Sequence, residues 1–178
     1  MRYGVLVLAG LMMAAPVAAQ VVPNPRLGTA EGRCRDGEAG PGFLITLNGL
    51  KDRRGLARVE LYPADDADFL ADDAVLINAG KPFRRAEIRV PATGPVQLCI
   101  RAPSGGSWAL SILHDRDSNR RLGISTDGVA FPGNRRLRLR QPRASEATAT
   151  ARGAGLTPIS VVMQYRTGLL SFGQIAAR

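Results

Sequence analysis

The stretch Ser107-Trp-Ala-Leu-Ser-Ile-Leu-His114 decides the fold of this chain of 178 residues. Trp108, Leu110 and Ile112 recur with a period of two, which places them on one face of a β-strand. Similar alternation is found in segments separated by Gly, Pro, Asp and Asn: residues 43–47, 57–62, 83–90, 96–101, 136–140, 147–151 and 158–165. Residues 69–79 are ambiguous and allow a single helical turn near 68–72. The sequence therefore predicts an all-β domain of roughly seven to nine strands, packed as an antiparallel β-sandwich.

The N-terminal residues 1–19 are typical of a secretory signal peptide. Arg2 supplies a positive charge, residues 5–15 are apolar, and Val17-Ala18-Ala19 offers small residues for cleavage. An uncleaved anchor is the alternative. We expect an extended arm at 20–42, the β-sandwich at 43–166 and a C-terminal tail at 167–178. No second apolar run is long enough to cross a bilayer, so we expect an exported, periplasmic or extracellular protein that does not span the membrane.

Cys34 and Cys99 are the two cysteines of the chain. In an exported protein an even pair is most simply a disulfide, because the compartment is oxidising. The competing possibilities, a metal pair or a redox pair, need a C-x-x-C spacing or nearby His ligands, which the sequence lacks. We therefore predict a Cys34–Cys99 disulfide.

The chain is strongly basic, with 24 Lys and Arg against 15 Asp and Glu. Such a charge attracts polyanions and anionic membrane surfaces. Export argues against nucleic acid, which leaves an acidic envelope polymer or lipid headgroups as partners, or simply a solvated basic surface. The densest group of positive charges is a patch formed by Arg135, Arg136, Arg138, Arg140 and Arg143. We predict a strand here that presents Arg136, Arg138 and Arg140 as a row on one face. The alternative is an edge strand whose charges discourage pairing with other chains.

Five segments together resemble the exported bacterial proteins known as domain of unknown function 2141. They are Leu47-Asn-Gly-Leu50, Val59-Glu-Leu-Tyr62, Gly106-Ser-Trp-Ala109, His114-Asp-Arg-Asp-Ser-Asn119 and Asp127-Gly-Val-Ala-Phe131. The resemblance spans about residues 43–165 and implies an immunoglobulin-like or transthyretin-like sandwich in the cell envelope, without an established activity. Trp108 stands where Tyr is usual in the family, and Arg120-Arg121 replaces a Gly-Lys type pair. The second departure weakens a metal site carried over from relatives.

Asp115-x-Asp117-x-Asn119 places hard oxygen donors at alternate positions, as in the first half of a calcium-binding loop. Asp127 offers a further oxygen ligand, so these four residues form a candidate Ca²⁺ site. Against it, Arg120 stands where the turn needs Gly, and Thr126 stands where a bidentate carboxylate is needed. The favoured alternative is that the carboxylates accept backbone N–H bonds and shape a long turn, with Asp–Arg pairing inside the loop.

His114 is the only histidine of the chain and suggests a hydrolase as a weaker alternative. Asp115 is its neighbour on the strand and faces the opposite way, so it is poorly placed to orient the ring. The sequence has no nucleophile elbow, P-loop or His-rich metal set. We therefore expect a non-enzymatic binding or structural module with no obligatory cofactor.

Overall fold

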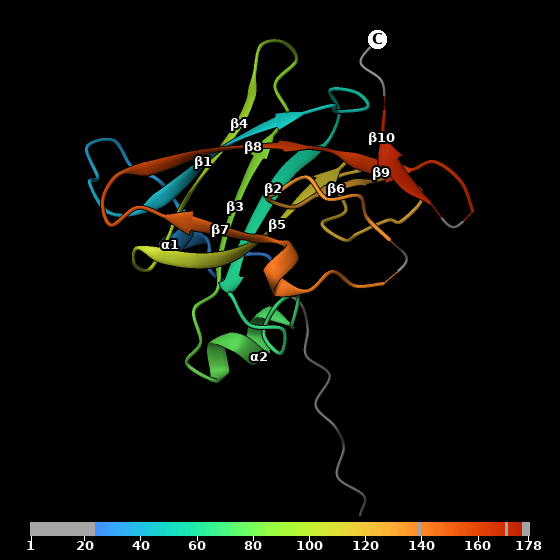
Figure 1. Cartoon of the computed structure of the whole chain (residues 1–178). Coiled ribbons are helices and arrows are strands. Elements are labelled where there is room, and N and C mark those ends of the chain that lie inside the picture. Colours follow the sequence, from blue (N-terminus) through green and yellow to red (C-terminus); the bar gives the residue numbers. More distant parts are fainter. Residues whose placement is uncertain (1–23, 139, 170, 176–178) are drawn as a thin grey trace, which may run out of the picture.

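The computed structural model describes residues 24–138, 140–169 and 171–175 (Figure 1). The expected signal peptide at 1–19 and the first residues of the arm lie outside the described residues. No helix within the described part of the chain is long and apolar enough to cross a membrane.

The described residues form ten strands and little helix. The strands are β1 (Gly42–Asn48), β2 (Leu56–Pro63), β3 (Arg84–Arg89), β4 (Val96–Arg101), β5 (Gly106–Asp115), β6 (Gly128–Ala130), β7 (Thr148–Ala151), β8 (Leu156–Val162), β9 (Gln164–Arg166) and β10 (Phe172–Gln174). The helices are α1 (Thr29–Gly32), α2 (Asp73–Asn78) and the 3-10 helix η1 (Ala144–Glu146).

The strands are arranged in two sheets, as the prediction of an all-β sandwich requires (Figure 1). One sheet has the order β4-β1-β8, and the other has the order β10-β9-β6-β5-β2-β3, with β7 also paired to β5. One pair departs from the antiparallel expectation, because β1 and β8 run parallel, with Phe43 opposite Thr157. The chain can pair β1 and β8 in this way because they are far apart in the sequence and need no tight hairpin between them.

The core lies between the two sheets and is built from the alternating residues of the central strands. Ile45 of β1, Leu98 of β4, Leu61 of β2 and Ile112 of β5 are all 0% exposed. Trp108 is only partly buried at the start of β5. A second apolar cluster, which includes Tyr62, Phe69, Leu76, Phe83 and Phe131, packs beneath α2.

The predicted disulfide between Cys34 and Cys99 is present, with 5.9 Å between the two Cα atoms. It fixes the arm to β4, an edge strand of the smaller sheet. The arm also pairs with β3, an edge strand of the larger sheet, because the Arg85 N–H donates to the Gly28 carbonyl (3.0 Å). The arm is not wholly extended, since it contains α1. It closes one side of the sandwich by joining two sheet edges.

Beside the arm, an ion network is buried at the face of β2 and β3. The Arg85 guanidinium contacts Glu60 (2.7 Å) and Asp73 (3.0 Å), and Arg85 is 8% exposed. It also donates to the Asn24 carbonyl of the arm (3.2 Å). Glu60 accepts a further bond from the Tyr62 hydroxyl (2.6 Å). The pKa of Arg85 is raised because these carboxylates outweigh the burial that opposes its charge. We call Arg85, Glu60, Asp73 and Tyr62 the buried network.

Candidate functional site

His114 lies near the end of β5 and is 0% exposed. Its Nε2–H donates to the Arg54 carbonyl (2.8 Å), so Nδ1 is left as the acceptor for the Tyr165 hydroxyl (2.6 Å). Burial lowers the pKa of His114 and favours the neutral ring. Both ring nitrogens are therefore occupied by the protein itself, and Asp115 is not among their partners.

The Tyr165 hydroxyl joins this histidine to the loop between β1 and β2. It accepts a bond from the Lys51 N–H (2.9 Å), and burial raises the pKa of Tyr165 to about 12. The ring of Tyr165 lies against Gly128, where a Cβ atom would come within 2.4 Å of it. Gly128 thus allows β6 and β9 to approach closely enough for the hydroxyl to reach His114.

The loop that follows β5 is shaped by carboxylates that accept backbone bonds. Asp115 accepts from the Asn119 N–H (3.2 Å) and the Arg120 N–H (2.7 Å). Asp117 accepts from the Asn119 N–H (3.1 Å), and Asp127 accepts from the N–H groups of Arg116 (3.0 Å) and Gly123 (2.7 Å). The loop is therefore a long turn tied to its own acidic side chains.

The same loop brings three carboxylates together. Asp115, Asp117 and Asp127 each offer an oxygen, and these oxygens lie within 4.8 Å of one another. Asp115 and Asp127 are each 1% exposed. Burial raises the pKa of Asp115, and its contacts with Asp117 and Asp127 add to the effect. Asn119 lies beside the cluster, with its side-chain N–H donating to Asp117 (2.8 Å).

The expected Asp–Arg pairing inside this loop is wrong for the residues that the structure describes. The Arg116 side chain pairs instead with Asp52 of the β1–β2 loop, and this contact holds the pKa of Asp52 well below its usual range. The Arg120 side chain pairs with Glu87 of β3 (3.1 Å). The backbone of Arg120 adopts a left-handed conformation (φ 61°).

The described residues of the arginine patch do not form the predicted strand. Residues 135–138 have no strand pairing, because their backbone is held by the side chain of Gln164 in β9. Gln164 Oε1 accepts from the Leu137 N–H (3.0 Å), and its Nε2 donates to the Arg135 carbonyl (2.8 Å). This amide, 1% exposed, takes the place of a neighbouring strand. The alternation of Leu and Arg predicted a strand, but the backbone bonds of this segment to Gln164 are made by a side chain and not by a neighbouring strand.

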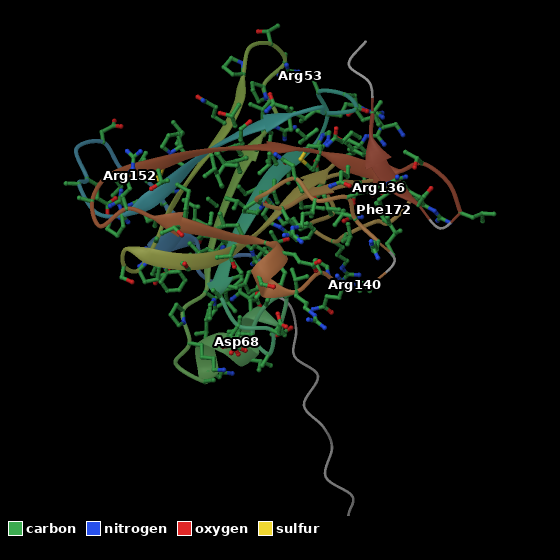
Figure 2. All side chains as sticks on the ribbon, in the orientation of Figure 1. Arg53, Asp68, Arg136, Arg140, Arg152 and Phe172 are labelled. Carbon is green, nitrogen blue, oxygen red and sulfur yellow. A yellow bond between two sulfur atoms is a disulfide. The ribbon has the colours of Figure 1, made fainter. Side chains whose placement is uncertain are left out.

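Four of the five arginines of the patch surround one hollow. The hollow has a volume of about 910 Å³ and lies between residues 131–146 and the start of β10. Figure 2 shows Arg136, Arg140 and Phe172 on this side of the molecule. We call it the arginine hollow; it is lined by Arg135, Arg136, Arg138 and Arg140 together with Phe131, Leu137, Pro142, Glu146, Ser171 and Phe172.

The charges of the hollow are only partly neutralised. Arg140 pairs with Glu146 (2.7 Å), whose pKa is lowered to about 2 by that contact. Within the described residues, Arg135, Arg136 and Arg138 have no carboxylate within 4 Å. The fifth arginine, Arg143, does not line the hollow; it is the N-cap of η1, where its backbone N–H donates to Glu146 (2.9 Å). The hollow therefore has an excess of positive charge, and its lining also contains apolar side chains.

Several residues of these sites could not be found by sequence reasoning. Gln164, Tyr165 and Asp52 each act on a segment far away in the chain, and their own neighbours carry no signal for it. Phe172 lies in the expected tail, which the structure shows to contain β10. The only available signal was the polar Gln164 between Met163 and Tyr165, which interrupts an apolar strand.

The fold and these two sites define a small, disulfide-linked β-sandwich with an acidic loop at one end and a basic hollow at its flank. Residues 45–157 match a family described as "Uncharacterized protein conserved in bacteria (DUF2141)", and the chain belongs to this family. Searches of curated proteins and of solved structures found no match.

Proposed function

We propose that this chain is an exported, non-enzymatic protein of the cell envelope that binds an anionic partner in the arginine hollow. The observation that carries the proposal is the arrangement of Arg135, Arg136, Arg138 and Arg140 around a hollow of about 910 Å³. Guanidinium groups bind phosphate and carboxylate groups through paired hydrogen bonds, so several at one hollow favour a polyanion.

The location is supported by the disulfide. Disulfides persist in oxidising compartments and are rare in the cytosol, so the Cys34–Cys99 bond favours export. The signal-peptide pattern of residues 1–19 favours it independently.

A non-enzymatic role is supported by the surroundings of His114. A general base must reach the proton that it removes, but this ring is 0% exposed and both nitrogens are hydrogen-bonded to Tyr165 and Arg54. A hydrolase that uses His114 would require this end of the sandwich to open.

Binding of lipopolysaccharide and of inorganic polyphosphate tests the proposal. We expect both to bind at low salt and to dissociate steeply as the salt concentration rises. Arg136→Gln with Arg138→Gln removes two cations from the hollow and should weaken binding roughly 30-fold, at about 1 kcal/mol for each charge.

The matched control is Arg89→Gln with Arg152→Gln, which removes the same charge from exposed positions outside the hollow. Figure 2 shows Arg152 on the side of the molecule away from Arg136. Equal losses in the two double variants would mean that overall charge, and not the hollow, attracts the anion.

A second candidate function, Ca²⁺ binding, is favoured by the three carboxylates of the loop after β5. Hard oxygen ligands suit Ca²⁺, and a bound cation would favour the ionised form of Asp115, whose pKa is raised by burial and, to a smaller extent, by Asp117 and Asp127. In this candidate Asp115, Asp117 and Asp127 supply carboxylate ligands and Asn119 an amide oxygen. The Arg120 side chain pairs with Glu87, which partly offsets its charge near the loop.

Thermal melting with calcium and with chelator tests this candidate. Ca²⁺ at about a hundred times its dissociation constant should raise the melting temperature by about 5–10 °C. Asp117→Ala should remove the increase, whereas Asp36→Asn, an exposed carboxylate of the arm, should keep it. Identical melting curves with calcium and chelator would remove the candidate.

A further inference from the structure

Exposed apolar side chains gather at one end of the sandwich. Of the large hydrophobic residues that are exposed in the described chain, three lie in loops: Leu122 (54%), Ile124 (56%) and Leu169 (84%). The others, Val75 (54%) and Ile77 (37%), lie on α2. Exposed apolar groups that cluster on a folded surface mark contact with a partner or a membrane.

The strand register places the three loop residues at the same end. His114 of β5 lies opposite Gly128 of β6, and Gly128 lies opposite Tyr165 of β9. The β5–β6 loop and the β9–β10 turn therefore leave the larger sheet side by side. α2 follows the far end of β2, so Val75 and Ile77 lie at the opposite end of the molecule (Figure 1).

The loop between β5 and β6 is held so that its apolar side chains point outward. Three hydrogen bonds hold Gly123. Its N–H donates to the buried Asp127 side chain (2.7 Å), and its carbonyl accepts from the N–H groups of Thr126 (3.0 Å) and Asp127 (2.8 Å). Leu122 and Ile124, on either side of Gly123, are left in solvent. The exposure of Leu122 and Ile124 thus follows from the hydrogen bonds that hold Gly123.

The turn between β9 and β10 is held in a similar way. The Arg166 side chain donates to the carbonyls of Gly168 (2.9 Å) and Leu169 (2.8 Å), and the Thr167 N–H donates to the Ser171 carbonyl (2.9 Å). Ser171 also lines the arginine hollow, so this turn joins the hollow to the loop end.

Cations surround these apolar tips. Four exposed cationic side chains at this end of the larger sheet have no carboxylate within 4 Å in the part of the chain that the structure describes: Lys51 and Arg53 of the β1–β2 loop, Arg121 of the β5–β6 loop, and Arg166 at the end of β9. Of the acidic residues here, Asp115 and Asp127 are buried and Asp52 is paired with Arg54 and Arg116. Asp117 is the exposed carboxylate among these loops, so the four cations outnumber it. The end of the sandwich thus combines apolar tips with a cationic surround.

We propose that this end docks on an anionic lipid surface, with Leu122, Ile124 and Leu169 entering the interface and the surrounding cations meeting the headgroups. The inference deepens the proposed function by naming a membrane as the source of the anionic groups, and it adds a surface beyond the arginine hollow. A soluble polyanion matches the charges but offers nothing to the apolar tips, whereas an anionic bilayer matches both.

Vesicle sedimentation tests the inference. Wild-type protein should bind vesicles of phosphatidylcholine with phosphatidylglycerol and should bind pure phosphatidylcholine vesicles at least about tenfold more weakly. Leu122→Ser with Ile124→Ser should weaken binding to the anionic vesicles about tenfold, and Leu169→Ser should weaken it about threefold. The matched control, Val75→Ser with Ile77→Ser, removes two exposed apolar side chains from the opposite end and should bind like wild type.

Binding of polyphosphate separates this inference from the proposed function. The Leu122 and Ile124 variant should keep full polyphosphate binding, which also shows that it is folded. If that variant binds anionic vesicles as well as wild type, the docking inference is overturned while the hollow stands. If vesicle binding depends on Leu122, Ile124 and Leu169 while wild-type protein does not bind polyphosphate at all, the docking inference stands and the proposal of anion binding in the arginine hollow fails.

Self-association, measured by sedimentation velocity, is the remaining outcome. If the substitutions change self-association and leave vesicle binding unchanged, the apolar tips contact a second copy of the chain and the inference is overturned.

Discussion

Two groups of arginines in this protein have opposite surroundings. Arg85 in the buried network is 8% exposed and contacts two carboxylates and a backbone carbonyl. Its guanidinium carbon also lies over the Phe83 ring, 5.0 Å from the ring centre. Arg136 and Arg138 at the arginine hollow are exposed, and within the described residues they have no carboxylate within 4 Å.

The comparison distinguishes arginines that stabilise the fold through ion pairs from arginines that are available to bind an anionic partner. A buried guanidinium must be paired, because leaving it or its carboxylates alone costs several kcal/mol. An exposed guanidinium contributes little to the free energy of unfolding but can exchange water for an anion. The net charge of the sequence does not distinguish the two, although only the second group gives the protein a basic surface.

The largest effect is expected when the buried group is broken. Arg85→Ala leaves Glu60 and Asp73 without their shared cation and should lower the free energy of unfolding by about 3–5 kcal/mol. Arg136→Ala should change it by no more than about 0.5 kcal/mol. Urea denaturation of both variants, with Arg85→Lys as a partial rescue, measures the difference. Equal losses would erase the distinction between the two groups.

The next effect concerns the arm that covers the buried network. Cys34→Ser with Cys99→Ser releases the arm from β4 and should lower the free energy of unfolding by about 2–4 kcal/mol. Because Asn24 and Gly28 contact Arg85, hydrogen exchange should rise at the Arg85 amide more than at Arg135. A uniform change in exchange would show that the arm and the network are independent.

A smaller effect is expected at the residue that holds the exposed group. Gln164→Ala leaves the Leu137 N–H and the Arg135 carbonyl without their partners and should cost about 1–2 kcal/mol. The variant should also lose most polyphosphate binding, because the guanidinium groups are no longer held around the hollow. Gln97→Ala, an exposed glutamine of β4, is the control and should leave both measurements unchanged.

The smallest effect is a pH dependence that neither group of arginines can produce, since both keep their charge near neutrality. The folded-state pKa of His114 lies below its ordinary value, so its contribution to stability is complete above about pH 6.5 and is lost as the pH falls toward the folded-state pKa. The melting temperature of the wild type should therefore decrease between pH 7 and pH 5. His114→Gln removes the only histidine, and its melting temperature should be nearly constant over this interval.

Most of the fold could be predicted because alternation is a local property. Ala57, Val59 and Leu61 were placed on one face by their spacing, and each is 0% exposed. Short elements were missed, since β6 and β10 have three residues each and are too short for a period of two to show. The sequence of residues 136–140 alternates as well as that of any strand, but the amide of Gln164 bonds the backbone of Arg135 and Leu137.

The candidate sites could be predicted only in part. The spacing of Asp115, Asp117 and Asn119 indicated a turn tied by carboxylates, and the structure has these bonds. The structure also brings Asp127, which the sequence analysis included in the candidate site, close to Asp115 and Asp117. Arg116 and Arg120 could not be assigned, because their partners Asp52 and Glu87 lie on other elements.

The sequence by itself determined the alternating strands, the two cysteines, the excess of arginine and the acidic loop, because each depends on residue types and short spacings. Only the tertiary structure decided which arginines are paired and which remain exposed, and which apolar side chains reach solvent. The physical reason is that pairing and exposure depend on what lies within a few ångströms in space, and in a sandwich those neighbours come from distant parts of the chain.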